Sequence, residues 1–328
     1  QSKILDIENR IFEQLNTYIL SESKNISINS SLINKLDLLS SFAEKAIKEN
    51  YVRPNLSERP ILEIIKGRHP VVEKLLPSTE KFIPNDLRLN SQINQIHLIT
   101  GPNMAGKSTY LRQVGLIGLM SQIGSFVPAK SAKIGIVDRL FTRVGASDNL
   151  AGGESTFMVE MNEAANILNN ATEKSLILLD EIGRGTATFD GLSIAWAITE
   201  YIHDSPGVNA RTLFATHYHE LVDLANNLKN ANNLNILVEE SSDKSDIVFL
   251  RKIVEGGTDK SYGIYVAKMA GLPNQVISKS KIYLELLISK QKNKSLINDK
   301  ELKIMIDKID NKDAHLYNDF INELNKIN

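Results

Sequence analysis

Residues 101–109 read Gly101-Pro102-Asn103-Met104-Ala105-Gly106-Lys107-Ser108-Thr109 and fit the pattern G-x-x-x-x-G-K-[ST]. In this pattern several backbone N–H groups converge on the phosphates of a nucleotide, and glycines let the main chain come close enough. Lys107 supplies a positive charge for the β- and γ-phosphates, and the Ser108 hydroxyl is a ligand for Mg²⁺. The stretch therefore predicts a loop that binds ATP with Mg²⁺.

The flanking residues support a phosphate-binding loop over an ordinary glycine-rich turn. Residues 95–100 are a short apolar run that predicts a strand, and residues 110–123 have a helical pattern. The loop would thus lie between the carboxyl end of a strand and the N-terminus of a helix, where the helix dipole favours anions.

A second strong pattern is the stretch Ser175-Leu176-Ile177-Leu178-Leu179-Asp180-Glu181. Its apolar run predicts a strand buried on both faces, as in a parallel sheet. Acidic residues at the carboxyl end of such a strand lie where parallel sheets bind ligands. We expect Asp180 to hold Mg²⁺ directly or through water, and Glu181 to orient and deprotonate the attacking water.

Two further candidates have both a structural and a functional interpretation. Residues 211–217 predict another buried strand that ends in His217, which is either structural or a group that senses or stabilises the γ-phosphate. Phe82 precedes a predicted strand and either packs in the core or stacks on a nucleotide base.

The polar segment 149–156 contains two adjacent glycines and leads into a predicted helix. Ser155 or Thr156 is suited to cap the N-terminus of this helix. The alternative is that the segment, with its hydroxyls and free N–H groups, forms a second anion site far in sequence from the first.

The remaining segments divide the chain into four predicted parts. Residues 1–54 contain two apolar helical runs around the polar break Ser21–Asn25 and predict a helical hairpin, and prolines mark a boundary near residue 55.

Residues 55–260 are the predicted ATPase domain. Within it, 132–135 and 139–144 are expected to form an inserted sheet, and 234–238 with 247–250 a hairpin. Residues 261–290 predict two helices, and 291–328 a polar helical or disordered tail.

Composition limits the classes of function. The chain has 328 residues, 42% hydrophobic content and a net charge of −1. This charge balance does not indicate a nucleic-acid-binding surface. There is no cysteine, no apolar run of the ~20 residues that a bilayer span needs, and no signal peptide, so we expect a cytoplasmic protein without membrane contact. The chain starts at Gln1 in a helical pattern, which we interpret as a piece of a longer polypeptide.

Strands alternating with helices, and nucleotide-binding groups at strand ends, predict an α/β P-loop NTPase with a doubly wound, mainly parallel sheet. It would follow the helical hairpin and precede a C-terminal helical segment. Glu181 directly after Asp180, and the helix start at Ser155, favour the ABC-like branch of these ATPases. In that class two subunits close each other's sites.

The motifs Thr100–Gln113, Ser155–Met161, Asp180–Thr186 and Phe214–Tyr218 closely resemble those of the MutS family of DNA mismatch-repair ATPases. The resemblance covers the C-terminal half of the family, from the opening helices to about residue 288. It implies a homodimer that couples ATP binding and hydrolysis to mismatch recognition. It also implies a MutL-type partner protein, and mismatched double-stranded DNA bound through domains absent from this chain.

The same resemblance assigns roles to single residues. Ser155 would reach the γ-phosphate bound by the opposite subunit, and Asn103 would lie beside the γ-phosphate. Phe82 would stack on adenine with the Ile83 backbone beside it, and the helices of residues 262–289 would dimerise.

Three positions depart from the family, and two other functions stay open. Ala105 and Ala187 stand where many members have Gly and Ser, and all of these side chains are small. Arg251 stands where some relatives have a His near the nucleotide. No mismatch-reading module with its Phe-x-Glu motif is found in the sequence. The alternatives are a MutS paralogue acting on branched DNA or collided ribosomes, and a nucleotide-gated dimerisation scaffold with negligible turnover.

Overall fold

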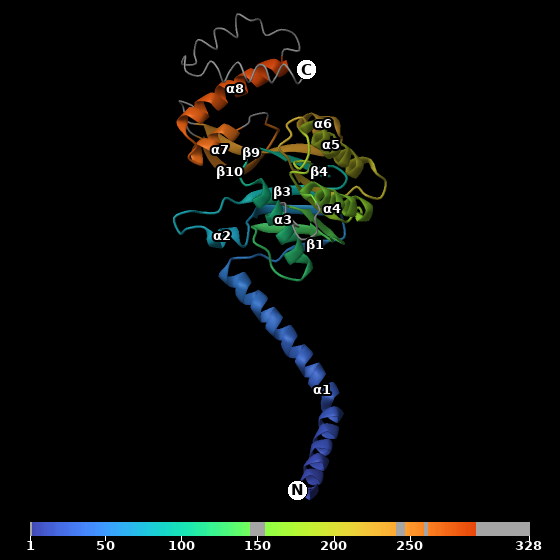
Figure 1. Cartoon of the computed structure of the whole chain (residues 1–328). Helices are drawn as coiled ribbons and strands as arrows, with labels where there is room; N and C mark the ends of the chain where they lie inside the picture. Colours follow the sequence, from blue (N-terminus) through green and yellow to red (C-terminus); the bar gives the residue numbers. More distant parts are fainter. Residues whose placement is uncertain (1, 145–154, 241–246, 259–261, 293–328) are drawn as a thin grey trace, which may run out of the picture. The chain divides into compact units, whose positions relative to one another are not determined.

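The computed structural model describes residues 2–144, 155–240, 247–258 and 262–292 (Figure 1). The chain divides into two compact units, Gln1–Ser261 and Tyr262–Asn328. None of the helices in the described ranges is long and apolar enough to cross a membrane.

The first unit begins with one continuous helix, α1 (Ser2–Lys48), so the predicted helical hairpin is wrong (Figure 1). The polar break at residues 21–25 contains no glycine or proline, and its side chains form hydrogen bonds inside the helix. The Ser21 hydroxyl donates to the Tyr18 carbonyl at 2.7 Å, and the Asn25 amide donates to Glu22 Oε2 at 2.7 Å. A polar stretch of this kind gives the helix a solvent-exposed polar surface and does not end the helix.

A six-stranded sheet forms the centre of the first unit, and it is largely parallel, as predicted. Its strand order is β10-β9-β4-β8-β7-β6, and only β10 runs antiparallel to its neighbour. The strands span Ile96–Thr100 (β4), Leu140–Arg143 (β6), Leu176–Asp180 (β7), Arg211–Ala215 (β8), Ala231–Glu240 (β9) and Ile247–Glu255 (β10). The hairpin predicted in this region is the β9–β10 pair.

Helices pack on both faces of this sheet, because its central strands are buried on both sides. Side chains of α3 (Lys107–Gln122) join one apolar cluster, and side chains of α4 (Thr156–Asn170), α5 (Thr188–Asp204) and α6 (Leu221–Asn227) join the other. The alternation of strands and helices that the sequence predicts is therefore found, with the helices divided between the two faces.

A second sheet has four strands in the order β1-β5-β2-β3. They span Asn55–Ser57 (β1), Ile61–Gly67 (β2), Asn85–Asn90 (β3) and Ser131–Gly135 (β5), and the short helix α2 (Val72–Leu75) lies between β2 and β3 in the sequence. The expected inserted sheet of residues 132–135 and 139–144 is wrong, because β5 pairs with β1 and β2 whereas β6 pairs with β7. Leu62 and Ile134, which pair in the smaller sheet, are fully buried, and Leu140 pairs with the buried Leu176 in the larger sheet.

Arg211 of β8 joins the two sheets. Its guanidinium is fully buried and donates to the carbonyls of Ile61 (3.2 Å) and Gly135 (3.4 Å), both on strands of the smaller sheet. It also donates to the carbonyls of Ile136 at 3.1 Å and Lys174 at 2.6 Å. Burial lowers the pKa of Arg211 to about 10, against the effect of the Asp138 charge, and the four carbonyls accept hydrogen bonds from its two terminal nitrogens.

The described part of the second unit consists of α7 (Gly263–Met269) and α8 (Asn274–Lys292), near the two helices that the sequence predicts. Gly271 has a left-handed φ of +85°, and the Leu272 N–H donates to the Ala267 carbonyl at 3.2 Å, which together end α7. Pro273 then stands directly before the first residue of α8.

Candidate nucleotide-binding site

The loop of residues 101–109 joins β4 to α3, in the strand–loop–helix context that the sequence predicts. Gly101 and Gly106 have φ values of +138° and +110°, so both positions need the freedom of glycine. Met104 also has a left-handed φ of +65° and is exposed. Ala105 is buried and does not take a positive φ, so an alanine fits this position of the loop.

Lys107 is the first residue of α3 and only 4% exposed. Its Nζ atom donates to the carbonyls of Gly101 (2.7 Å) and Pro102 (3.2 Å) and lies 3.6 Å from Glu181 Oε1. Burial lowers the pKa of Lys107, whereas the nearby Glu181 and Asp180 carboxylates raise it. The lysine is thus held inside the loop with its charge directed at the acidic pair.

Asp180 is the last residue of β7, the second strand from β4 in the sheet, and it lies beside Ser108. Burial raises the pKa of Asp180, against the effect of a side-chain hydrogen bond with Ser108. Its Oδ1 atom is buried and has no hydrogen-bond partner among the described residues. A buried carboxylate oxygen without a donor, next to a serine hydroxyl, fits the oxygen ligands of Mg²⁺. The described residues contain no group of three His, Asp or Glu side chains able to hold a metal by themselves.

Glu181 follows Asp180 in a left-handed conformation with a φ of +56°, which is uncommon for a residue with a side chain. Its N–H donates to the Ala215 carbonyl at 2.8 Å, which ties this turn to the end of β8. Its carboxylate forms ion pairs with Lys107 and with Arg184. The backbone turn thus directs Glu181 toward the phosphate-binding loop.

His217 lies just beyond the end of β8 and is partly buried. Burial lowers its pKa, while the charge of Glu181 raises it. The His217 Nδ1 atom is buried without a hydrogen-bond partner in the described ranges, and the ring centroid lies 4.1 Å from that of Tyr218. His217 therefore lies at the same edge of the sheet as Glu181, close enough for the Glu181 charge to act on the His217 pKa.

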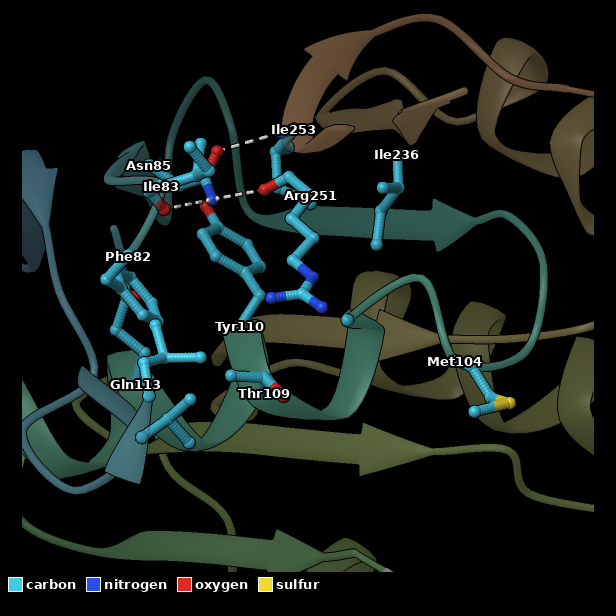
Figure 2. Close-up of a pocket in the computed structure, with 13 residues that line it drawn as sticks. Phe82, Ile83, Asn85, Met104, Thr109, Tyr110, Gln113, Ile236, Arg251 and Ile253 are labelled. Atoms are coloured by element: carbon cyan, nitrogen blue, oxygen red, sulfur yellow. Dashed lines mark hydrogen bonds between the residues drawn. The ribbon is translucent and has the colours of Figure 1, made fainter. Parts of the chain in front are cut away.

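A cavity of about 300 Å³ lies beside the phosphate-binding loop and is lined by Phe82, Ile83 and residues of α3 and β10 (Figure 2). Gly106 and Thr109 belong to both the loop and the cavity lining. The cavity is mostly apolar in its residues and opens next to the expected phosphate position, which suits a nucleotide base. Phe82 and Ile83 are thus brought to the loop as the sequence analysis expects.

The sequence analysis missed Asn85 and Tyr110, which also line the cavity. The Asn85 amide donates to the carbonyls of Ile83 (3.3 Å) and Arg251 (3.0 Å), and its oxygen accepts the Ile253 N–H at 2.8 Å (Figure 2). Asn85 therefore fixes β10 against the start of β3. No sequence signal indicates this role, because the two partners on β10, Arg251 and Ile253, lie far away in the chain.

Ser155 caps the N-terminus of α4, since its hydroxyl accepts the Met158 N–H at 3.2 Å. It is exposed, and this capping bond joins it to its own helix. The glycine-containing part of the expected second anion site, residues 149–153, lies outside the described residues. The structure thus supports the capping interpretation and leaves the Ser155 hydroxyl at the surface.

Taken together, the glycine-containing loop between β4 and α3, its buried lysine and the acidic pair at the end of β7 define a P-loop ATPase of the α/β class. Residues 97–288 match the family model described as MutS domain V. The chain therefore belongs to the MutS family and carries its ATPase domain.

Curated relatives with the name DNA mismatch repair protein MutS are similar over most of this chain. The protein from Salinibacter ruber is 57% identical over 289 residues, which are 88% of this chain and 32% of the relative. The protein from Chlorobium chlorochromatii is 57% identical over 281 residues, covering 86% of this chain and 32% of the relative. The protein from Acetivibrio thermocellus is 56% identical over 287 residues, which are 88% of this chain and 32% of the relative. The chain thus spans about a third of the length of the relatives it matches.

Proposed function

We propose that this chain binds and hydrolyses ATP with Mg²⁺ at the site formed by residues 101–109 and the end of β7. The observation that carries the proposal is the convergence of Lys107, Asp180 and Glu181, with Lys107 Nζ 3.6 Å from Glu181 Oε1. Three charged side chains from two distant parts of the sequence meet at the N-terminus of α3, where a helix dipole favours an anion.

Each residue of the site has a role in this proposal. Backbone N–H groups of residues 101–109, which include Asn103 and Thr109, surround the phosphates, and Lys107 contacts the β- and γ-phosphates. Ser108 and Asp180 would hold Mg²⁺, and the ion would supply positive charge for the phosphate oxygens. Glu181 orients the attacking water and accepts its proton, and His217 senses the γ-phosphate. Phe82 stacks on the base, with the Ile83 backbone beside it.

We further propose that two copies of the chain form the working ATPase, in the manner of ABC-type ATPases. The exposed Ser155 hydroxyl at the start of α4 would reach the γ-phosphate held by the partner copy. The helices α7 and α8 would contribute to the dimer contact. The division into residues 1–54, 55–260, 261–290 and 291–328 belongs to the same proposal.

In the full-length protein, we propose that ATP binding and hydrolysis drive the conformational changes that follow mismatch recognition in cytoplasmic DNA mismatch repair. The names of the relatives support this, and the charge balance of this chain does not suggest that it binds DNA itself. Mismatched DNA would be read by other parts of the protein, and a MutL-type protein would be a partner.

The test is a single-turnover hydrolysis assay with purified chain, Mg²⁺ and radiolabelled ATP. We expect inorganic phosphate to form at a rate that depends on Mg²⁺ and on protein concentration, since the active species is a dimer. ATP binding without phosphate release above background would favour a nucleotide-gated dimerisation scaffold and would contradict the enzyme proposal.

A further inference from the structure

Glu160 links α4 to the loop that carries Glu181. Glu160 is only 4% exposed, and its Oε1 atom accepts the backbone N–H of Gly183 at 2.5 Å. The Gly183 carbonyl in turn accepts the Tyr218 hydroxyl at 2.9 Å. Both backbone groups of Gly183, two residues after Glu181, are therefore bonded to buried side chains.

Arg143 of β6 holds the Glu160 carboxylate. Its guanidinium lies 3.9 Å from Glu160 Oε2, and its Nε atom lies 3.0 Å from Glu163 Oε2. Arg143 is 7% exposed, so the pair with Glu160 is shielded from water, while Glu163 is largely exposed. The charge on Glu160 is thus balanced without any group of the nucleotide site.

The loop packs closely against α4 and α5. A Cβ atom at Gly183 would lie 2.6 Å from the Gly191 carbonyl oxygen, and Gly183 has a left-handed φ of +92°. A Cβ atom at Gly185 would lie 2.9 Å from Phe157 Cβ, in the first turn of α4. Two separate contacts, Glu160 with Gly183 and Phe157 with Gly185, therefore hold the loop against the same helix.

We propose that Glu160 is a positioning residue for ATP hydrolysis, which acts through the Gly183 N–H to keep the Glu181 carboxylate aimed at the attacking water. This rests on the proposed function, because it assumes that Glu181 acts as the base. Glu160 would not touch the nucleotide. Its loss should therefore slow hydrolysis while ATP binding, which depends on residues 101–109, stays nearly unchanged.

The test compares single-turnover hydrolysis with ATP affinity in variants of the full chain. Glu160→Ala leaves the Gly183 N–H buried without an acceptor, and we expect hydrolysis to slow by roughly 10- to 100-fold, as for a small misplacement of a catalytic group. ATP affinity should change by less than about threefold. Glu160→Gln keeps a carbonyl oxygen for Gly183 and should restore most of the rate.

The matched control is Glu163→Gln, one turn further along α4. It also removes a carboxylate from Arg143 but not an acceptor from Gly183, so we expect a nearly normal rate. Should Glu160→Ala fail to fold, Glu160→Asp keeps the charge, withdraws the oxygen from Gly183 and should show the same selective loss of rate.

A folded Glu160→Ala or Glu160→Asp variant with an unchanged rate, or one that loses ATP affinity as strongly as rate, would overturn the inference. If the parent chain itself releases no phosphate, the proposed function fails as well. An active parent with an equally active variant refutes only the role of Glu160.

Discussion

The Nζ atom of Lys107 lies 3.6 Å from Oε1 of Glu181, and both side chains are largely shielded from water. A triphosphate bound at the loop would attract the lysine and repel the glutamate. The two residues therefore lead to different predictions: Lys107 should matter for ATP binding and Glu181 for ATP hydrolysis.

Replacing Lys107 with alanine should weaken ATP binding. The variant loses a charge-assisted contact worth about 1.5–3 kcal/mol, which corresponds to roughly 10- to 100-fold in the dissociation constant. Isothermal calorimetry with a non-hydrolysable ATP analogue measures the change. Unaltered affinity would show that Lys107 does not contact the phosphates.

Replacing Glu181 with glutamine should keep ATP binding and abolish most of the hydrolysis. The amide cannot accept the proton of the attacking water, while removal of a negative charge near the phosphates does not oppose binding. Phosphate release in a single turnover and analogue affinity are measured side by side. Retained turnover would place the general base on another residue.

Mixing Ser155→Ala with Lys107→Ala chains tests whether two copies share a site. If Ser155 acts on the partner's nucleotide, a mixed dimer has one site with both lesions and one intact site. Random pairing would then restore up to ~25% of the parent activity, since half of the dimers are mixed. Equal mixtures that stay as inactive as either variant alone would place Ser155 outside the partner's site.

The stability of the fold should fall in mild acid because of His97. This side chain is buried in β4, and burial lowers its pKa from 6.5 to about 4. Between these values the unfolded chain takes up a proton that the folded chain does not, so stability decreases as pH falls. We expect a loss of about 1–2 kcal/mol between pH 7 and pH 5. Urea denaturation at both pH values measures it.

The control for this prediction is His97→Leu, which removes the titrating group from β4. The variant should lose stability less steeply between pH 7 and pH 5 than the parent does. The same slope in both proteins would assign the acid sensitivity to other groups.

The sequence predicts those parts of the site that are local in the chain. The strand, loop and helix around Lys107 are encoded within about thirty residues, and the short apolar run before Asp180 indicates a buried strand. The choice of sheet for β5 and β6 is not local, because it depends on which distant apolar strand each one meets. Glu160 and Asn85 were missed for the same reason, since their partners are backbone groups far along the sequence.

The predicted hairpin at the N-terminus was wrong for a different reason. A change from apolar to polar residues was interpreted as a turn, although Ser21–Asn25 contains no residue that breaks a helix. Composition alone does not end a helix when the polar side chains can form hydrogen bonds along it.

Arg211 ties the larger sheet to the smaller sheet beside the candidate nucleotide site. Phe82 and Ile83 precede β3 of the smaller sheet, and the phosphate loop follows β4 of the larger sheet. Arg211 stands on β8, next to β4, and its guanidinium donates to carbonyls of Ile61 and Gly135 in the smaller sheet. We therefore expect the two sheets to keep their relative position when a nucleotide binds beside residues 101–109. Any conformational change that ATP drives would then lie outside the two sheets.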